Sequence, residues 1–342
     1  MGIGIALAER GLLPDALITW GIRSLLMKRL KEEEARADRY HQDFVTSLRN
    51  APVALATDLA NEQHYEVPAA FFETVLGPRL KYSCCLYPDH VQSLAEAEEA
   101  MLKLSCERAG LADDMHILEL GCGWGSLTLW MAEQYPNATI HAVSNSNTQR
   151  EFIEARCQAN GWEHVTVETC DMNDFQTEQR YDRVLSVEMF EHMRNYAELL
   201  RRIRGWLSPE GQLFVHIFCH ERYTYPFETE GDDNWMGRYF FTGGMMPAYD
   251  LLQEFDQDLV VAEQWPVNGI HYYRTCMDWL KNMDANRQPI LELFQETYGN
   301  ADAERWFQRW RIFFLSCAEL FHYRQGKCWF VGHYLLQPKR DT

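Results

Sequence analysis

The sequence predicts an α/β fold in which a mixed, Rossmann-like sheet is flanked by helices. Three observations support this prediction: an apolar run leads into three alternating glycines, further apolar runs follow at intervals of about a helix length, and polar residues stand after each run. Short apolar runs bounded by turn residues are typical of strands that are buried on both faces. Their alternation with helical stretches indicates a largely parallel sheet, because parallel strands need a long crossover between them.

The first predicted strand is the apolar run at residues 117–120, and the glycines follow it directly. Gly121 and Gly123 allow backbone N–H groups to approach a ligand that a Cβ atom would exclude. Residues 126–134 are predicted to form a helix whose N-terminus points at the same ligand. The spacing lacks the last glycine of the dinucleotide fingerprint, and Glu119 before the turn would repel a diphosphate but attract an ammonium group. An ordinary glycine-rich turn is the alternative.

Polar residues at the ends of the next two strands extend this ligand site. The second predicted strand ends at Asn145, and Gln149 opens the following helix. Many nucleotide-binding folds place an acid there to hold the ribose hydroxyls, so neutral amides would have to replace it. The third strand ends near Asp171 and Met172, where a carboxylate and an apolar side chain would suit an adenine ring. A helix-capping aspartate is the alternative for Asp171.

The fourth predicted strand, residues 181–187, leads directly into an acid-rich segment that contains Glu188, Glu191 and His192. In an open α/β sheet the carboxyl ends of the strands face the ligand crevice, so this segment lies where chemistry is expected. Spacings of three and four residues would place the three side chains on one surface of a helix. The alternative is a solvated helix start, where acids favour the helix dipole.

Taken together, these motifs resemble a known family of S-adenosylmethionine (SAM)-dependent methyltransferases. The family contains the cyclopropane fatty acid synthases, the mycolic acid methyltransferases and the plant benzylisoquinoline-alkaloid N-methyltransferases, with the coclaurine N-methyltransferases as the nearest type. The resemblance runs from about residue 11 to the C-terminus and implies a class I SAM-dependent methyltransferase fold, with an N-terminal helical cap and inserted substrate-binding elements. Besides the segments above, it rests on Tyr82-Ser83-Cys84-Cys85, Ser144-Asn145-Ser146, Cys219-His220 and Trp329.

The resemblance implies SAM as the cofactor, S-adenosyl-L-homocysteine as the product, and no metal. SAM carries its methyl group on a positively charged sulfonium, so positioning of the nucleophile does most of the work. The residues expected around the cofactor are Tyr82, Ser83, Glu119, Gly121, Gly123, Asn145, Gln149, Asp171 and Met172.

An amine acceptor needs a base, because an alkylamine is mostly protonated at neutral pH and then has no lone pair for the methyl group. Histidine has the side-chain pKa nearest neutrality, so His192 is the predicted base. Glu191 is predicted to orient the imidazole and Glu188 to anchor the ammonium, and the resemblance to the alkaloid branch implies the same three catalytic residues. Aromatic walls hold flat rings and attract cations, and the expected substrate-binding residues are Tyr65, Tyr239, Phe241 and Trp329.

Two other functions stay open. In the lipid branch of the family a bound bicarbonate removes the proton while an alkene becomes a cyclopropane, and the residues that match its four places here are Cys84, Glu191, His216 and Tyr272. Against the lipid branch stand the acidic composition and Glu188, where that branch usually has a glycine. A catalytically silent SAM-binding regulator is the third alternative, and the intact Glu191-His192 pair argues against it.

The composition limits the partners of the protein. Lys and Arg total 32 against 50 Asp and Glu, and the formal net charge of −18 opposes binding to nucleic acid or anionic lipid. The predicted partner is a small-molecule amine, without stable membrane insertion because no apolar run has the length of a bilayer span. A homodimer is left open. The ten cysteines contain no C-x-x-C pair and no signal peptide is recognisable, so a cytoplasmic location is expected.

The chain divides into four regions without an obvious linker. Apolar residues recur near a helical period between residues 16 and 30, which predicts a cap that packs on the catalytic domain rather than on a membrane. Later strands are expected near 260–265 and 329–336. The regions are an N-terminal helical cap at 1–60, a lead-in segment covering the cofactor site at 61–94, the SAM-binding core at 95–220, and a substrate-binding insertion with C-terminal strands at 221–342.

Overall fold

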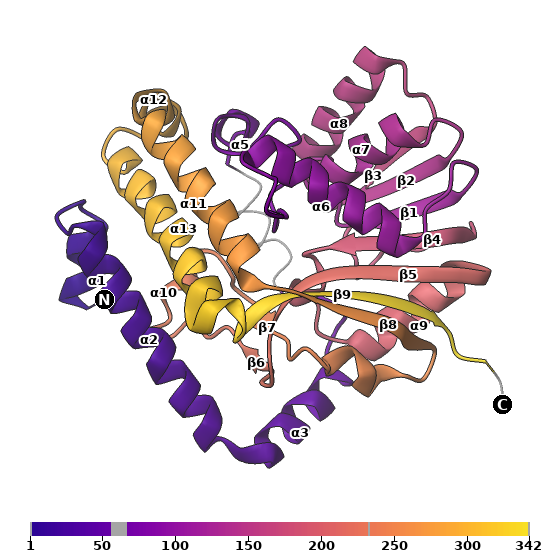
Figure 1. The fold of residues 1–342 in the computed structure, drawn as a ribbon, viewed down its shortest axis with the longest axis horizontal. Coiled ribbons are helices and arrows are strands. Elements are labelled where there is room, and N and C mark those ends of the chain that lie inside the picture. The colour runs from indigo at the N-terminus through magenta and orange to yellow at the C-terminus, as the bar shows by residue number, and fades with distance from the viewer. Residues whose placement is uncertain (1, 56–66, 232, 341–342) are drawn as a thin grey trace.

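The computed structural model describes residues 2–55, 67–231 and 233–340, and its centre is one seven-stranded sheet (Figure 1). In spatial order the strands are β3 (Val165–Thr169), β2 (Thr139–Ser144), β1 (His116–Leu120), β4 (Tyr181–Val187), β5 (Leu207–His220), β9 (Trp329–Pro338) and β8 (Leu259–Val267). The first five strands in this order are parallel, whereas β9 runs antiparallel to both β5 and β8. The mixed α/β sheet expected from the sequence is therefore confirmed.

Helices cover both faces of the sheet because successive strand residues point to opposite sides. Ile117 and Leu185 pack with α6 (Leu94–Ala109) and α7 (Ser126–Gln134) in one apolar cluster. Leu118 pairs in register with Val184, and both pack in a second cluster with α9 (Tyr196–Trp206). A further helix, α8 (Asn147–Asn160), packs against β2 and β3. The carboxyl ends of the parallel strands are thereby held at a common edge.

A second group of helices packs beside this edge of the sheet and encloses its own aromatic core (Figure 1). Its longest members are α2 (Asp15–Ala35), α11 (Gly269–Ala285) and α13 (Ala303–Gly326), and α13 contacts both of the others. The remaining elements are α1 (Ile3–Ala8), α3 (Ala37–Leu48), α5 (Ala69–Val75), α10 (Trp235–Tyr239), α12 (Arg287–Tyr298), the short strands β6 (Tyr225–Pro226) and β7 (Met245–Met246), and the 3-10 turns η1 (Phe190–His192) and η2 (Leu251–Phe255).

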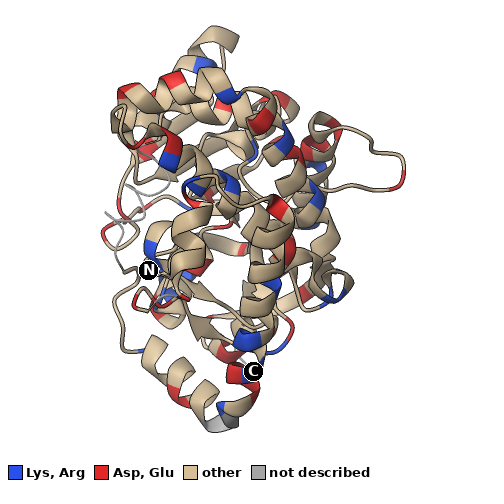
Figure 2. Cartoon of the chain, turned by 90° about the vertical axis from the view of Figure 1, so that its left-hand side faces the viewer, with Lys and Arg blue, Asp and Glu red and all other residues tan. Residues whose placement is uncertain are grey.

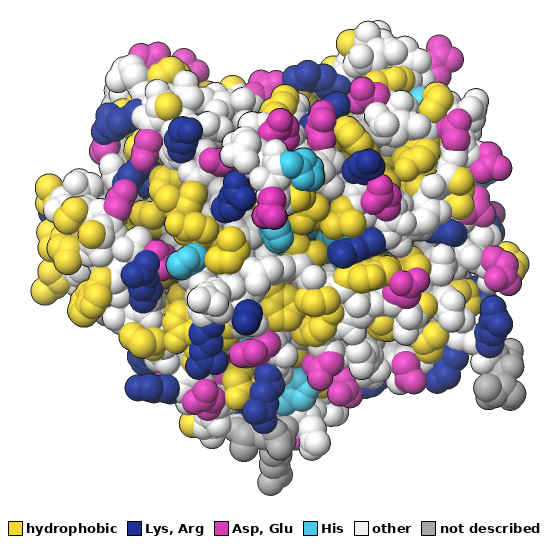
Figure 3. Space-filling view, viewed as in Figure 1, with side chains coloured by type: hydrophobic (Ala, Val, Ile, Leu, Met, Phe, Trp, Pro, Cys, Tyr) yellow, Lys and Arg dark blue, Asp and Glu magenta, His cyan; other side chains and the backbone are white. Residues whose placement is uncertain are grey.

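The surface carries both signs of charge, although the chain is acidic in total. Lys and Arg positions are interspersed with Asp and Glu positions along the helices in Figure 2. Hydrophobic side chains gather over the N-terminal helices at the left of Figure 3, where the exposed residues include Ile3, Leu12, Leu17 and Trp20. Among the described residues, no helix has both the length and the apolar character needed to cross a bilayer.

Candidate active site

The glycine turn after β1 adopts a backbone that glycine alone accepts easily. Gly121 and Gly123 have φ values of +78° and +53°, in the left-handed region. A Cβ on Gly121 would lie 2.7 Å from the Cγ atom of Met189, whereas a Cβ on Gly123 would have no atom within 4 Å. The first glycine is therefore required by packing, and the second leaves open space beside the turn.

Two small cavities, each of about 70 Å³, adjoin this turn, and we call them the cofactor cavities. The first is lined by the predicted residues Tyr82, Ser83, Glu119, Gly121, Gly123 and Gln149, together with Ser126 and Trp124. The second is lined by the predicted residues Gly121, Gly123, Asn145, Gln149 and Met172. Asp171 lines neither cavity; its Oδ1 accepts the backbone N–H of Asn173 at 2.7 Å within a turn that does not lead into a helix.

Several polar groups of the cofactor cavities fit SAM. The Nε2 atom of Gln149 and the Oγ atom of Ser126 are buried and have no hydrogen-bond partner within the described chain, so both are available to a polar ligand. The carboxyl group of Glu119 accepts the hydroxyl of Thr128 at 2.5 Å, and burial raises its pKa to about 8. A ligand ammonium beside Glu119 would favour its ionised form.

A larger cavity of about 250 Å³, the acceptor cavity, lies between the sheet edge and the second group of helices. Its walls are mainly apolar and aromatic, and they come from α2, α11, α13 and the segment between β5 and β7. The lining includes Ile22, Leu25, Leu26, Phe218, Tyr225, Phe227, Met236, Phe241, Tyr272, Trp279, Phe313 and Phe321. Of the predicted substrate residues only Phe241 is among them, and Tyr65 lies outside the described residues.

Tyr239 and Trp329 were expected in the wall of this cavity, but the structure places both behind it. Trp329 is fully buried at the start of β9 and donates its indole N–H to the hydroxyl of Tyr225 at 3.0 Å. Tyr225 itself lines the cavity, so Trp329 supports the wall from the second layer. Tyr239 is covered by the guanidinium of Arg309, 4.1 Å from its ring centroid. Aromatic content alone did not distinguish wall residues from the core.

The segment after β4 does not form the helical surface that the spacing predicted. β4 ends at Val187, Glu188 has a left-handed φ of +48°, and only the 3-10 turn η1 follows. The expected helix was wrong because a residue with a left-handed φ cannot belong to a right-handed helical turn, so Glu188 lies outside the short turn that contains Glu191 and His192. The three side chains still converge, since Glu188, Glu191 and His192 all line the acceptor cavity.

Glu188 lies where the three cavities meet, and each of its oxygens has a partner. Its Oε1 accepts the backbone N–H of Cys84 at 3.1 Å and lies 3.2 Å from the Nε2 of His216, while its Oε2 accepts the hydroxyl of Tyr272 at 2.6 Å. It lines the acceptor cavity and both cofactor cavities. Cys84, His216 and Tyr272 are three of the four residues matched to bicarbonate, and here they hold the carboxylate of Glu188.

Burial shifts the pKa values of Glu188, Glu191 and His216, and in each case it favours the uncharged form. Burial raises the pKa of Glu188, while the nearby ammonium of Lys81 and the hydroxyl of Tyr272 oppose that rise. Burial and the charge of Glu188 together raise the pKa of Glu191 well above its usual value. Burial lowers the pKa of His216 well below its usual value, so the ring is neutral near pH 7. Because the charge of Glu188 adds to the effect of burial at Glu191, a proton shared by this pair is held more readily by Glu191.

His192 borders two of the three cavities. It lines the acceptor cavity and the second cofactor cavity, and its ring stacks on Phe241 with centroids 6.1 Å apart. The Oε2 atom of the neighbouring Glu191 is buried and has no hydrogen-bond partner among the described residues. The structure thus brings a histidine, a neutral carboxyl group and a carboxylate to the inner end of the acceptor cavity.

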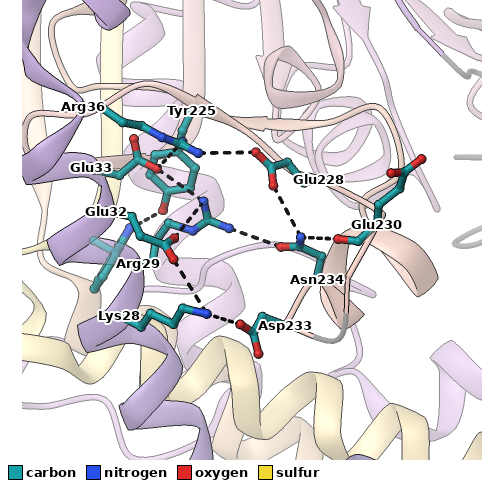
Figure 4. Close-up of polar contacts among 11 residues, drawn as sticks. Lys28, Arg29, Glu32, Glu33, Arg36, Tyr225, Glu228, Glu230, Asp233 and Asn234 are labelled. Carbon is teal, nitrogen blue, oxygen red and sulfur yellow. Dashed lines mark hydrogen bonds and ion pairs between the residues drawn. The ribbon is translucent and has the colours of Figure 1, made fainter. Parts of the chain in front are cut away.

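Part of the lining of the acceptor cavity is formed by polar contacts between α2 and the segment 225–238, which we call the rim (Figure 4). Lys28 pairs with Asp233, and Arg29 donates to the Oδ1 of Asn234 at 3.2 Å. Two turns further, Arg36 reaches Glu228 at 3.5 Å. These rim residues and the cavity residues of α2 were not predicted, although the helical period at 16–30 had indicated a face that packs on the catalytic domain.

Comparison with known proteins agrees with this geometry. The family described as mycolic acid cyclopropane synthetase matches residues 56–331. The (S)-coclaurine N-methyltransferase of Thalictrum flavum subsp. glaucum is 38% identical, over 97% of this chain and 94% of the relative, and that of Papaver somniferum is 35% identical, over 97% and 96%. A crystal structure of coclaurine N-methyltransferase bound to N-methylheliamine and S-adenosyl-L-homocysteine superposes with a TM-score of 0.93 at 36% identity, over 97% of this chain and 98% of that chain.

Proposed function

The chain belongs to the mycolic acid cyclopropane synthetase family and is a SAM-dependent N-methyltransferase, and we propose that it methylates the nitrogen of a benzylisoquinoline-type amine, a tetrahydroisoquinoline. One observation carries the proposal: Glu188 and His192 stand together where an aromatic cavity meets the cofactor cavities. Relatives named as coclaurine N-methyltransferases support the same substrate class.

The aromatic walls of the acceptor cavity suit a flat, cationic amine. Phe241, Trp279 and Phe321 offer ring faces that attract both apolar rings and a positive charge. The carboxylate of Glu188 adds a negative charge at the inner end of this apolar space. An ammonium drawn to Glu188 is thereby placed beside the cofactor cavities, while the apolar walls exclude water from the reacting nitrogen.

When bound, SAM supplies an electrophilic methyl group from its sulfonium and leaves as S-adenosyl-L-homocysteine. Glu119, Gly121, Gly123, Asn145 and Gln149 would hold it, with Ser126 as a further donor. His192 takes the ammonium proton and frees the nitrogen lone pair that forms the new N–CH₃ bond. Burial and the charge of Glu188 favour a neutral Glu191, whose Oε2 has no partner among the described residues and is available to the imidazole when the ligands are bound.

The lipid alternative finds no support in the site. Cyclopropane formation in that branch needs a bicarbonate at the place defined by Cys84, His216 and Tyr272, and in this chain those groups already bind the carboxylate of Glu188. Burial keeps His216 neutral, and Glu191 is neutral as well. The groups that would hold the bicarbonate are therefore satisfied by a side chain.

Two further assignments belong to the same proposal. Residues 1–60 act as a cap over the acceptor cavity, supported by the contributions of Ile22, Leu26 and Arg29 to its lining. A cytoplasmic location is supported by the ten cysteines, which are all free thiols.

The test is a methyltransferase assay with two substrate panels. The purified chain and SAM are incubated with secondary and tertiary tetrahydroisoquinolines and simpler arylalkylamines, and separately with vesicles of monounsaturated phospholipid. Mass spectrometry should show one methyl group added to nitrogen in the first panel and no change in the acyl chains of the second. Turnover of acyl chains with no amine methylated would overturn the proposal in favour of the lipid branch.

A further inference from the structure

A chain of two buried histidines connects Glu188 to an arginine outside the site. His216 on β5 and His333 on β9 are direct cross-strand partners, and both are completely buried. The Nε2 of His333 lies 2.9 Å from the Nδ1 of His216, and an Nη atom of Arg108 lies 2.8 Å from the Nδ1 of His333. The Nε2 of His216 then faces Glu188 at 3.2 Å. Four residues that are distant in the sequence thus form one continuous series of hydrogen bonds.

Arg108 fixes the direction of this series at one end, and the reverse direction would also require a protonated Glu188, because a carboxylate can only accept. A guanidinium has only N–H donors and keeps its proton in proteins, so the Nδ1 of His333 must accept. Burial lowers the pKa of both histidines well below the usual value, and each ring therefore has a single N–H. The N–H of His333 is on Nε2 and donates to His216, whose own N–H is on Nε2 and donates to Glu188.

The position of Arg108 is itself fixed. Arg108 is half-buried near the end of α6, and its guanidinium lies over the ring of Trp265 at 5.0 Å from the centroid. Trp265 on β8 is the cross-strand partner of His333 on the side away from His216. The aromatic ring holds the cation against the histidine, because a guanidinium stacks well on an indole face.

We propose that Arg108 is a positioning residue for the methylation: it fixes the tautomers of His333 and His216, so that His216 always donates to Glu188 and Glu188 stays a carboxylate facing the amine. The inference rests on the proposed function for its amine, although the tautomers can be tested without a substrate. It also gives His216 a role that is not that of a base, because a ring that must donate from Nε2 has no lone pair facing the substrate.

Other groups also face Glu188 and bear on its protonation. Lys81 lowers the pKa of Glu188 through its charge, and the Tyr272 hydroxyl and the Cys84 backbone N–H lower it through hydrogen bonds. Glu191 repels it, since the two carboxyl groups are close enough for Glu188 to raise the pKa of Glu191. Tyr249 is the titratable neighbour of Arg108. Loss of Arg108 would leave all of these in place and remove the fixed direction of the histidine series, together with the positive charge that helps to lower the pKa of His216 and His333.

The tautomers can be read directly by NMR of protein labelled with ¹⁵N at histidine. Both His216 and His333 should show a protonated Nε2 and an unprotonated Nδ1 in the wild-type protein, with signals assigned through His216→Asn and His333→Asn. Arg108→Met should allow the His333 ring to reverse, so its signals should move toward the other tautomer, while Arg108→Lys should keep the wild-type pattern. A wild-type His333 protonated at Nδ1 would overturn the proposal without any variant.

The kinetic arm measures the pH profile of kcat/KM for a methylated amine. In Arg108→Met the acid limb should move to higher pH by about one unit, because Glu188 loses a fixed donor and is protonated more readily. Arg108→Lys should restore most of the wild-type profile. Arg79→Met is the matched control: Arg79 is also half-buried and stacks over Trp130 at 5.0 Å, but it has no contact with the series.

The outcomes separate the two proposals. If Arg108→Met keeps the wild-type tautomers and acid limb, Arg108 has no positioning role and the inference fails. If Arg108→Met and Arg79→Met both lose activity by the same factor at all pH values, the role of Arg108 is structural and the inference again fails. If no amine is methylated by the wild-type protein, the proposed function fails, and the wild-type NMR pattern still decides on the histidine series.

Discussion

At Glu188 an unfavourable backbone conformation is combined with favourable hydrogen bonds to the side chain. Its φ of +48° is a conformation that an L-residue adopts at a cost of about 1–2 kcal/mol. Its carboxylate, in return, receives hydrogen bonds from the lead-in segment, β5 and α11. Strain of this kind persists where the surroundings over-determine the residue, which is common at active sites.

The strain at Glu188 can be measured with a pair of variants. Glu188→Ala and Glu188→Gly both remove the carboxylate and leave the same donors without an acceptor, so both should lose amine turnover. Only glycine accepts the left-handed backbone freely, and Glu188→Gly should be more stable than Glu188→Ala by about 1 kcal/mol. Urea unfolding of the two proteins gives the difference. Equal stability would show that the backbone there carries no strain.

His192 provides the prediction for the base. His192→Ala should lower kcat by about 10²–10⁴-fold, because removal of the amine proton then falls to water. SAM affinity by calorimetry should stay close to that of the wild type, since most of the cofactor cavities is unchanged. The exposed His90, outside all three cavities, gives the control His90→Ala with wild-type kcat. A nearly silent His192→Ala together with an inactive His216→Ala would reassign the base.

At the scale of the element, the turn between β1 and α7 has a left-handed backbone at Gly123 and open space where a side chain at that position would lie. Gly161 at the end of α8 has a similar φ of +70°, and a Cβ added there would also have no atom within 4 Å, but it lines none of the three cavities. Gly123 and Gly161 therefore have similar left-handed backbones, but only Gly123 borders a cavity. Such a pair separates loss of a ligand site from loss of stability.

Gly123→Val should abolish SAM binding, whereas Gly161→Val should retain it. Both variants should lose stability by a similar amount, because each forces a β-branched residue into a left-handed backbone. Isothermal calorimetry with SAM and thermal unfolding of both proteins give the two readouts. Unchanged SAM affinity in Gly123→Val would show that the cofactor lies elsewhere.

Exposed ion pairs connect α2 to the segment 225–238 at the rim of the acceptor cavity. Lys28→Glu turns its ion pair with Asp233 into a repulsion and should raise the acceptor KM by about twofold to fivefold, with kcat nearly unchanged. High salt should shrink the effect, because exposed charges are screened. Lys103→Glu changes the net charge equally at an exposed α6 pair with Glu107 and should leave KM as in the wild type. A rise in KM in both variants would point to net charge rather than to the rim.

At the scale of the whole molecule, much of the sheet could be predicted, because its signals are local. The helix at 126–134 and the strand at 181–187 have the predicted bounds, since apolar runs and glycines mark them. The orientation of the Glu188 side chain could not be predicted, because a single residue with a left-handed φ leaves no periodic pattern in the sequence. His333 was missed for another reason: it meets His216 only through the pairing of β5 with β9.

Glu119 links the cofactor site to the stability of the whole molecule. Burial raises its pKa from 4.5 to about 8, so the folded state binds one more proton than the unfolded state between these values. The contribution of Glu119 to stability is therefore complete below pH 4.5 and is lost as the pH rises to about 8. Without SAM, the unfolding free energy of Glu119→Gln should fall less over this pH range than that of the wild type.

Urea unfolding at several pH values measures this difference. Glu163→Gln, at an exposed position, should follow the wild-type curve and serves as the control. If Glu119→Gln runs parallel to the wild type across the same range, Glu119 is ionised in the folded protein and the burial argument does not hold.

The carboxylate of Glu188 is an anion that the chain carries with it. A dissolved anion at the same place would be present only in proportion to its concentration and its dissociation constant, and it could leave between turnovers. A tethered group has no dissociation constant, and its effective concentration at the site is set by the fold alone. Supply of dissolved carbon dioxide therefore has no bearing on whether this place is filled, and every folded molecule has the carboxyl group of Glu188 at the place where we propose that the amine binds.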